Sequence, residues 1–334
     1  MMDSPYSGKP DVSVLMSCYN AARWLAEAID SVLAQTFRNF EFIIVNDGST
    51  DDTWSIIEDY RGRDERIVAV SKKNTGLQDS LNVGLALAKG EWIARLDADD
   101  LCEPTRFEEQ LDFVRKHDDV VLLGTGCLEI DEDGRVIKMH DYPTGHRSLT
   151  RRLERIRPFF PHSSAFYRTE TARRAGGYNV RIRRAEDWRL WLEMSMQGQI
   201  ACLPKPLIRF RKHAGQISYD GNGRRQVYDG IAATASHFLR KAGYEDPSAA
   251  QNPADWSVFL KWIEDETDRA LTFQRFRSWE DARVVYYSAG NRFAGIIRFS
   301  RKLWQSGHAG PLLWKKMFGT SMPERLAKEW MKTS

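Results

Sequence analysis

The sequence lacks the features that mark membrane-spanning, secreted and nucleic-acid-binding proteins. No apolar run in the chain approaches the roughly 18 residues that would predict a transmembrane helix. Residues 1–11 are short, polar and proline-bearing, so we expect no signal peptide. The four cysteines lie far apart without a Cys-x-x-Cys pair, which predicts reduced core thiols in a cytoplasmic protein. A formal charge of +3 over 334 residues is close to balance, and we expect no nucleic-acid partner.

Glycine is also missing at the place where a triphosphate-binding loop would need it. The first predicted strand, 12–17, is followed at 18–23 by Cys-Tyr-Asn-Ala-Ala-Arg. A nucleotidyltransferase holds its triphosphate with a glycine-rich, basic loop after this strand. The sequence therefore disfavours a nucleotidyltransferase, which is kept only as an alternative function.

The chain alternates strands and helices. Four strands are predicted, at 12–17, 40–45, 67–70 and 92–96. Between them, apolar residues at helical spacing predict helices at 24–35, 54–60 and 77–88. This alternation predicts an α/β fold with a mostly parallel sheet. Polar residues follow each strand, so one edge of the sheet gathers Tyr19, Asp47, Asn74, Asp97 and Asp99. Ligands of open α/β sheets bind at this edge, which makes it the predicted site.

The strand 92–96 runs directly into Asp97-Ala98-Asp99-Asp100. Carboxylates this close repel one another, and a divalent cation such as Mg²⁺ or Mn²⁺ offsets their charge because it prefers oxygen ligands. The alternative is a solvated acidic turn ahead of a helix, with Glu103 as its cap and Pro104 at its first position.

Four segments resemble, in order and spacing, the signature of the family 2 glycosyltransferases. They are residues 12–20, 42–51, 74–76 with 81–82, and 95–100. The resemblance covers roughly residues 10 to 215, with Cys18 standing where the family often has proline. It implies a GT-A fold and an enzyme that moves a sugar from a nucleotide diphosphate with inversion of the anomeric centre.

The resemblance also implies a donor site for a nucleotide sugar, with UDP as the expected nucleotide. Asp99 would contact the metal, Asp97 the ribose and Asp47 the uracil imide, while Tyr19 would stack on or edge the base. The implied donor-binding residues are Tyr19, Asn20, Asp47, Asn74, Gly76, Arg95, Asp97 and Arg211. A plain turn at Asp47-Gly48 and an ordinary half-buried aromatic at Tyr19 are the alternatives.

Ala185-Glu186-Asp187 opens the predicted helix 188–196 after a glycine turn and a basic stretch. Acidic residues at a helix start also favour the macrodipole, which is the structural alternative. The resemblance implies that Asp187 is the general base and that Glu186 positions it or the acceptor. One carboxylate is enough, because direct displacement needs a group that takes the proton of the acceptor hydroxyl.

Two later segments complete the predicted site. Residues 160–166 are predicted to form a strand on the acceptor side, where His162 is expected to be buried and hydrogen-bonded. Residues 209–213 resemble a family segment whose histidine completes the metal shell and whose basic residues face the diphosphate. His213 is therefore the second predicted metal ligand, with a structural role as the alternative.

Two basic stretches carry open alternatives. Residues 290–334 hold nine Lys or Arg and two Glu among large aromatics, which suits either an anionic membrane surface or a helical cap on the protein. The cluster Arg147, Arg151, Arg152, Arg155 and Arg157 suits either a phosphorylated acceptor or a solvated helix face.

We expect a glycosyltransferase domain at 10–220, with a nucleotide half at 10–100 and an acceptor half at 101–220 that includes a hairpin at Asp133-Gly134. Residues 221–334 are predicted to be helical at 224–242, 254–271 and 282–304, with a linker at 243–253. The predicted enzyme transfers a hexosyl or N-acetylhexosaminyl group to a saccharide or lipid-linked acceptor in polysaccharide or cell-envelope biosynthesis. It would lie in the cytoplasm or peripherally on the inner face of the cell membrane. The other alternative is a non-catalytic nucleotide- or carbohydrate-binding module, against which the intact Asp97, Asp99 and Asp187 argue.

Overall fold

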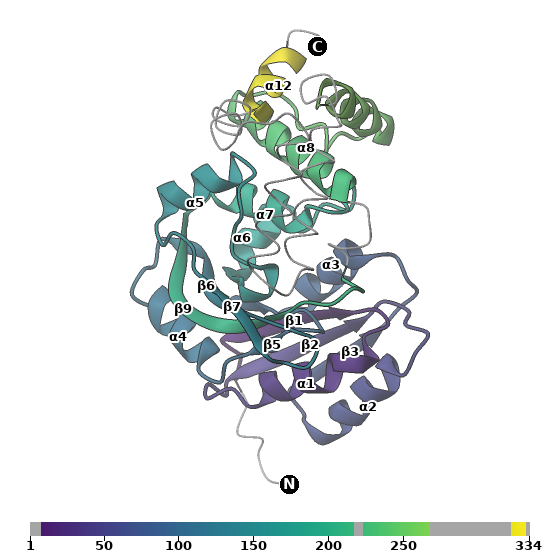
Figure 1. The fold of residues 1–334 in the computed structure, drawn as a ribbon, viewed down its shortest axis with the longest axis vertical. Helices are drawn as coiled ribbons and strands as arrows, with labels where there is room; N and C mark the ends of the chain where they lie inside the picture. The colour runs from purple at the N-terminus through teal and green to yellow at the C-terminus, as the bar shows by residue number, and fades with distance from the viewer. Residues whose placement is uncertain (1–7, 217–222, 268–321, 332–334) are drawn as a thin grey trace, which may run out of the picture. The chain divides into compact units, whose positions relative to one another are not determined.

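The computed structural model describes residues 8–216, 223–267 and 322–331 (Figure 1). The chain divides into two compact units, Met1–Leu153 with Arg157–Gln216 and Glu154–Ile156 with Ile217–Ser334. The predicted helix 282–304 and most of the basic stretch 290–334 lie outside the described residues. No helix in the described ranges is long and apolar enough to cross a membrane.

The first unit is built on one nine-stranded sheet. Its strands are β1 Val12–Cys18, β2 Phe40–Asn46, β3 Ile67–Ser71, β4 Trp92–Arg95, β5 Leu101–Cys102, β6 Val120–Ile130, β7 Val136–His140, β8 Phe166–Arg168 and β9 Gln199–Arg211. They lie in the order β3-β2-β1-β4-β8-β6-β9-β5, with β7 paired to β6. The pairs β1–β2, β1–β4 and β2–β3 are parallel, which brings the carboxyl ends of these four strands to one edge. The predicted α/β fold is confirmed.

Helices cover both faces of this sheet (Figure 1). They are α1 Ala22–Leu33, α2 Thr53–Arg63, α3 Leu77–Leu87, α4 Arg106–Val114, α5 His146–Leu153, α6 Thr169–Arg174 and α7 Glu186–Met194, with a 3₁₀ turn η1 at His162–Ser164. Side chains alternate along a strand, so β1 turns Val12, Val14 and Met16 to one face and Leu15 to the other.

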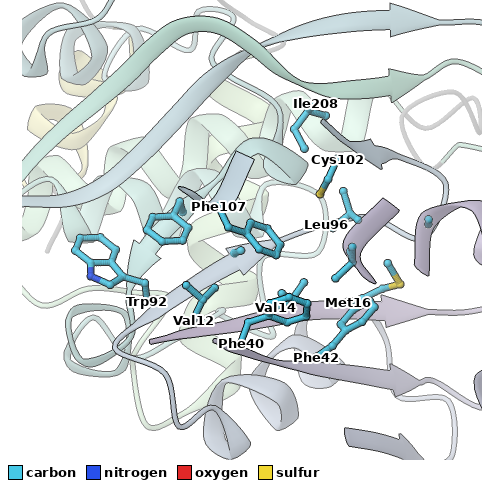
Figure 2. Close-up of a cluster of buried hydrophobic side chains, with 14 of the residues drawn as sticks. Val12, Val14, Met16, Phe40, Phe42, Trp92, Leu96, Cys102, Phe107 and Ile208 are labelled. Atoms are coloured by element: carbon cyan, nitrogen blue, oxygen red, sulfur yellow. The ribbon is translucent and has the colours of Figure 1, made fainter. Parts of the chain in front are cut away.

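The two faces carry separate apolar cores. Figure 2 shows the core on which α1 and α4 pack, where Phe107 of α4 lies among Val14, Phe40 and Phe42. The core on the other face is formed with α3, α5, α6 and α7 and contains the fully buried Trp191. Burial on both faces explains why the central strands read as continuous apolar runs.

The prediction of a strand at 160–166 is wrong. Residues His162–Ser164 form the 3₁₀ turn, closed by a hydrogen bond from Ser164 N to Pro161 O at 2.9 Å, and the strand begins only at Phe166. Helix α4 begins at Arg106 with Thr105 before it, so the alternative start at Glu103 and Pro104 is also wrong. The hairpin is confirmed by the antiparallel pair β6–β7.

The second unit is helical in its described part. It contains α8 Gly223–Lys241, a helix at 253–267 and α12 Met322–Trp330. In α12, Leu326 and Ala327 are fully buried, and the Trp330 ring lies 5.0 Å from that of Phe259 and 5.1 Å from that of Trp262. This end of the basic stretch therefore packs within its own unit.

Candidate active site

The loops after β1 and β2 are joined by side-chain hydrogen bonds. Asn20 N donates to Ser49 Oγ at 3.0 Å, and Asn20 Oδ1 accepts from Thr50 N at 2.8 Å. Asn20 has a φ of +49°, a left-handed conformation that asparagine tolerates better than most residues. Its neighbour Tyr19 keeps 54% of its surface exposed at this edge, so its ring is available to a ligand.

Asp47 is buried at the end of β2 with both carboxylate oxygens engaged. It accepts hydrogen bonds from Lys72 Nζ at 2.5 Å, Thr75 N at 3.0 Å and Gly76 N at 2.9 Å. Burial alone would raise the pKa of Asp47, but these donors outweigh it and hold the pKa below its ordinary value. A side-chain hydrogen bond from Ser80 also lowers the pKa of Asp47. Lys72, which the sequence analysis missed, is therefore part of the site.

The turn after Asp47 permits only glycine at position 48. Gly48 has a φ of +70°, and a Cβ atom there would lie 2.7 Å from Asn74 N. The close approach brings the loop that follows β3 against the loop that follows β2. It places Asn74 and Gly76 at the same edge as Asp47, as the sequence predicted for the polar ends of the strands.

Asp97 stands at the end of β4 between a buried guanidinium and a serine. Arg95 Nη2 lies 2.5 Å from Asp97 Oδ1, and Ser163 Oγ donates to Asp97 Oδ2 at 2.8 Å. Burial would raise the pKa of Asp97, but the charges of Arg95 and His162 and the hydrogen bonds from Ser163 and Arg95 together lower the pKa. Arg95 is fully buried and holds the side chain of Asp97, and its expected place among the donor-binding residues stays a prediction.

Asp99 and His213 meet beside Asp97. Asp99 Oδ2 lies 2.8 Å from His213 Nε2, and the imidazole packs 4.2 Å from the Trp24 ring. No group of three or more His, Cys, Asp or Glu side chains in the described ranges could hold a metal ion. The chain thus offers one carboxylate oxygen and one imidazole nitrogen, a donor pair that fits Mn²⁺ when a ligand supplies the other oxygens.

Arg211 is buried next to this pair and binds the backbone of Asp99. Its guanidinium donates to Asp99 O at 2.9 Å, to Glu132 O at 2.9 Å and to Glu27 Oε2 at 2.7 Å. Its backbone N donates to Asp100 Oδ1 at 2.8 Å. Arg211 is almost fully buried and supports the acidic edge, and its expected contact with the donor stays a prediction.

Asp100 is the buried member of the acidic cluster, and the sequence analysis gave it no role. Its Oδ2 lies 2.5 Å from Ser163 Oγ, the same hydroxyl that contacts Asp97. Burial, with the charges of Asp99 and Asp97, raises the pKa of Asp100 well above its usual range. Its place as the third acid of the cluster was the one signal in the sequence that could have indicated this role.

Glu186 and Asp187 occupy the first turn of α7. Burial raises the pKa of Asp187 to about 6, with the Asp97 charge adding to the effect and a hydrogen bond from Trp188 N opposing it. Burial and the Asp187 charge raise the pKa of Glu186 to about 8. Asp97 contributes to both shifts, which indicates that the two carboxyls face the acidic edge. At neutral pH the pair thus combines a carboxylate at Asp187 with a protonated acid at Glu186.

Gln78 of α3, also missed from the sequence, links the two halves of the site. Its Nε2 donates to Arg183 O at 2.7 Å and to Glu186 Oε2 at 3.3 Å. Gln78 follows two residues after Gly76, whose N–H binds Asp47. A single side chain therefore connects the donor loop with the segment that carries Asp187.

His162 is buried and hydrogen-bonded, as expected. Its Nε2 lies 2.9 Å from Tyr178 Oη, which in turn lies 3.0 Å from Tyr167 Oη. Burial and the Arg95 charge lower the pKa of His162 to about 3, so the ring is neutral. The four cysteines are free and buried, also as expected.

Known proteins are similar to this chain in sequence. The family model described as glycosyl transferase family 2 matches residues 13–176. An uncharacterized glycosyltransferase of Haemophilus influenzae is 33% identical over 247 residues, which span 71% of this chain and 76% of that protein. The chain belongs to the family 2 glycosyltransferases. The present chain is also 30% identical over 210 residues to the amylovoran biosynthesis glycosyltransferase AmsE of Erwinia amylovora. The match covers 62% of the present chain and 78% of AmsE.

Solved structures resemble the glycosyltransferase in fold. The S. aureus TarS 1–349 complex with UDP-GlcNAc superimposes with a TM-score of 0.60 at 19% identity, covering 89% of this chain and 92% of that one. The mannosyltransferase PcManGT of Pyrobaculum calidifontis, in complex with GDP-Man and Mn²⁺, gives a TM-score of 0.53 at 17% identity over 98% and 89% of the two chains. The predicted GT-A fold is confirmed.

Proposed function

We propose that this glycosyltransferase moves a sugar from a UDP donor to a saccharide or lipid-linked acceptor, with inversion and with Asp187 as the general base. The observation that carries the proposal is the raised pKa of Asp187 at the start of α7, close enough to Asp97 to sense its charge. A base with a pKa near the working pH combines a deprotonated state with useful proton affinity.

The donor occupies the edge formed by the loops after β1, β2, β3 and β4. Tyr19 covers the base, Asp47 accepts the uracil imide N–H, and Asp97 binds the ribose. Asn20, Asn74 and Gly76 shape the loops around the nucleotide, with Lys72 holding Asp47 ionised. The bound UDP-GlcNAc in the TarS complex, a protein of similar fold, supports UDP as the nucleotide.

Asp99 and His213 would hold a divalent cation, Mn²⁺ or Mg²⁺, together with the diphosphate of the donor. Such a cation, when bound, neutralises the charge that develops on the departing diphosphate. The Mn²⁺ in the PcManGT complex supports this assignment, and the imidazole ligand favours Mn²⁺ over Mg²⁺. Arg211 keeps Asp99 in place by binding its backbone carbonyl.

Asp187 carries out the proton transfer. Its carboxylate accepts the proton of the acceptor hydroxyl while that oxygen attacks the anomeric carbon. The bond from the anomeric carbon to the diphosphate oxygen breaks on the opposite face, and its electron pair leaves with UDP. One displacement of this kind inverts the anomeric centre. Glu186, protonated at neutral pH, positions the acceptor or the base.

The acceptor is proposed to be a growing saccharide or a lipid-linked saccharide. The relative AmsE, which is named for amylovoran biosynthesis, supports this proposal. Attachment of residues 290–321 to an anionic membrane stays a prediction, because those residues lie outside the described ranges. Co-sedimentation with phosphatidylglycerol vesicles, compared with phosphatidylcholine vesicles at low and high salt, tests it.

Asp187→Asn tests the mechanism. We expect UDP release from a panel of UDP-sugars in Mn²⁺ to fall by roughly a hundredfold, while UDP affinity changes by less than about threefold. Asp133→Asn, at the exposed hairpin turn, is the matched control and leaves both quantities unchanged. NMR of the first product formed should show the inverted anomer. A retained anomer, or equal losses of UDP binding and turnover in Asp187→Asn, would contradict the proposal, and release of pyrophosphate would support the nucleotidyltransferase alternative.

A further inference from the structure

Helix α5 carries a row of arginines that the site described above does not use. Arg147 and Arg151 are exposed and lie one helical turn apart, so they share a face. Arg152 and Arg157 lie partly buried at the C-terminal end of the helix, where Arg157 N donates to Arg152 O at 2.9 Å. We call these four residues the arginine row.

The orientation of α5 is fixed by its apolar side. Leu149 and Leu153 are fully buried in the core on which α7 also packs. Four residues separate them, so they form one stripe along the helix. Arg147 precedes Leu149 by two residues, and Arg151 precedes Leu153 by two. This spacing turns the guanidinium groups to solvent.

No carboxylate neutralises the exposed part of the row. Arg147 and Arg151 form no ion pair with any residue in the described ranges. The acidic residue between positions 146 and 157 is Glu154, and its carboxylate binds Lys241 Nζ at 2.9 Å instead. Arg157 Nε is buried without a hydrogen-bond partner among the described residues. The row therefore presents positive charge that an anionic ligand can satisfy.

The row ends beside the proposed base. Trp188 Nε1 donates to Leu153 O at 3.1 Å, which fixes the last turn of α5 against the first turn of α7. Trp188 is the neighbour of Asp187, and its backbone N binds Asp187 Oδ1 at 2.7 Å. An acceptor that brings a hydroxyl group to Asp187 thus has the C-terminal end of the arginine row close by.

The composition of the row favours phosphate as its ligand. Residues 146–157 contain five arginines and no lysine, and the planar guanidinium group binds phosphate oxygens in pairs. A membrane-binding helix needs large apolar residues among its basic ones on the exposed face. The exposed neighbours of Arg147 on α5 are instead polar, with Ser148 next to it. A phosphate-bearing molecule fits this surface better than a lipid surface.

We propose that the arginine row binds phosphate groups of the acceptor, so that the acceptor is a phosphorylated saccharide or polyol chain. The inference rests on the proposed function, because it takes Asp187 to be the residue that the acceptor hydroxyl must reach. The row then holds the anionic chain while Asp187 deprotonates the hydroxyl at its end. The phosphate groups undergo no reaction.

The test uses fluorescently labelled linear polyphosphate as the probe. Its binding to the full chain is measured by anisotropy with saturating UDP and Mn²⁺, which fill the donor site. The double variant Arg147→Gln/Arg151→Gln should bind the probe roughly tenfold more weakly than the unaltered chain. The control Arg61→Gln/Arg63→Gln removes two exposed arginines from the end of α2 and should change affinity by less than about twofold.

Equal affinity of the two double variants for polyphosphate would overturn the inference. So would an α5 variant that loses binding to phosphatidylglycerol vesicles while its polyphosphate affinity is unchanged, since the row would then face a membrane. Release of UDP from UDP-GlcNAc without an acceptor should be the same in the α5 variant and the unaltered chain. Failure of the unaltered chain to release UDP from any UDP-sugar would count against the proposed function alone, because polyphosphate binding does not depend on turnover.

Discussion

Two buried arginines determine the geometry of the acidic edge at the scale of single residues. Arg95 binds the side chain of Asp97, and Arg211 binds the backbone carbonyl of Asp99. Burying a guanidinium group is costly unless its hydrogen bonds are met, so each arginine strongly restrains the carboxylate or carbonyl that satisfies it. The two arginines thus hold Asp97, the proposed ribose contact, and Asp99, the proposed metal ligand, in place before a ligand binds.

Replacing Asp99 with alanine removes a proposed metal ligand. We expect turnover of the UDP-sugar donor to fall by at least roughly a hundredfold and to lose its response to added Mn²⁺. Asp133→Ala, which removes an exposed carboxylate from the β6–β7 hairpin, should retain both. Turnover is measured as UDP release over a Mn²⁺ titration, and a near-normal, Mn²⁺-stimulated rate in Asp99→Ala would refute the metal assignment.

The raised pKa of Asp187 predicts that activity, measured as kcat/KM against pH, falls on the acid side of the profile. The base works only when deprotonated, so kcat/KM should be lost as the pH falls through about 6. Glu186 is still protonated at that pH because its own pKa is raised to about 8. Glu186→Gln therefore changes no charge there and should leave the acid limb near pH 6. A limb near pH 4 in either protein would show that Asp187 is not the titrating base.

The sequence predicted which residue types gather at this edge but not which of them a ligand can touch. Tyr19, Asp47, Asp97 and Asp99 follow directly from the ends of strands. The burial of Arg95 could not be predicted, because a basic residue at a strand end is usually exposed and only the three-dimensional packing encloses it. Lys72 was missed for a similar reason, since its partner Asp47 lies 25 residues away in sequence.

At the scale of elements, the alternating first half was predictable and the later strands were less so. Strands β1, β2 and β4 are buried along almost their whole length and carry strong apolar runs, while α1 has its apolar residues at helical spacing. The turn η1 falls within the segment 160–166, which was predicted as a strand from its resemblance to the acceptor-side strand of the family. Its conformation depends on Ser163, whose hydroxyl binds Asp97 and Asp100 more than sixty residues away.

The link between α3 and the segment before α7 predicts a positioning role for Gln78. Gln78→Leu keeps the volume but leaves Arg183 O without its donor. We expect kcat to fall by roughly tenfold while the donor KM stays within about twofold, because the donor loop keeps its own contacts. Steady-state kinetics with a UDP-sugar give both values, and Gln199→Leu at an exposed position is the control. A rise in donor KM with unchanged kcat would place Gln78 in the donor site instead.

At the scale of the whole molecule, the helical second unit was predicted as helices but not as a packed core. Helical spacing identified 224–242, whereas the contact of Trp330 with Phe259 joins residues some seventy positions apart and leaves no local pattern. Large aromatics among basic residues looked like a membrane surface. In α12 the aromatic side chain is used for packing.

Leu326→Ala measures how much that packing contributes. Leu326 is fully buried, so the substitution should lower the free energy of unfolding by about 2–5 kcal/mol. Lys328→Ala, on the exposed side of the same helix, should change it by less than about 0.5 kcal/mol. Urea unfolding of the full chain provides the comparison. If the two variants unfold at the same urea concentration, α12 does not stabilise the second unit.

The contacts of Arg211 have a consequence for biosynthesis. Its partners Glu27 and Asp100 lie 184 and 111 residues earlier in the chain. The acidic residues are therefore translated long before Arg211, the residue that binds them. Until β9 has emerged, the nascent chain carries the acidic cluster without the hydrogen bonds that Arg211 makes to Asp99 O and Asp100 Oδ1.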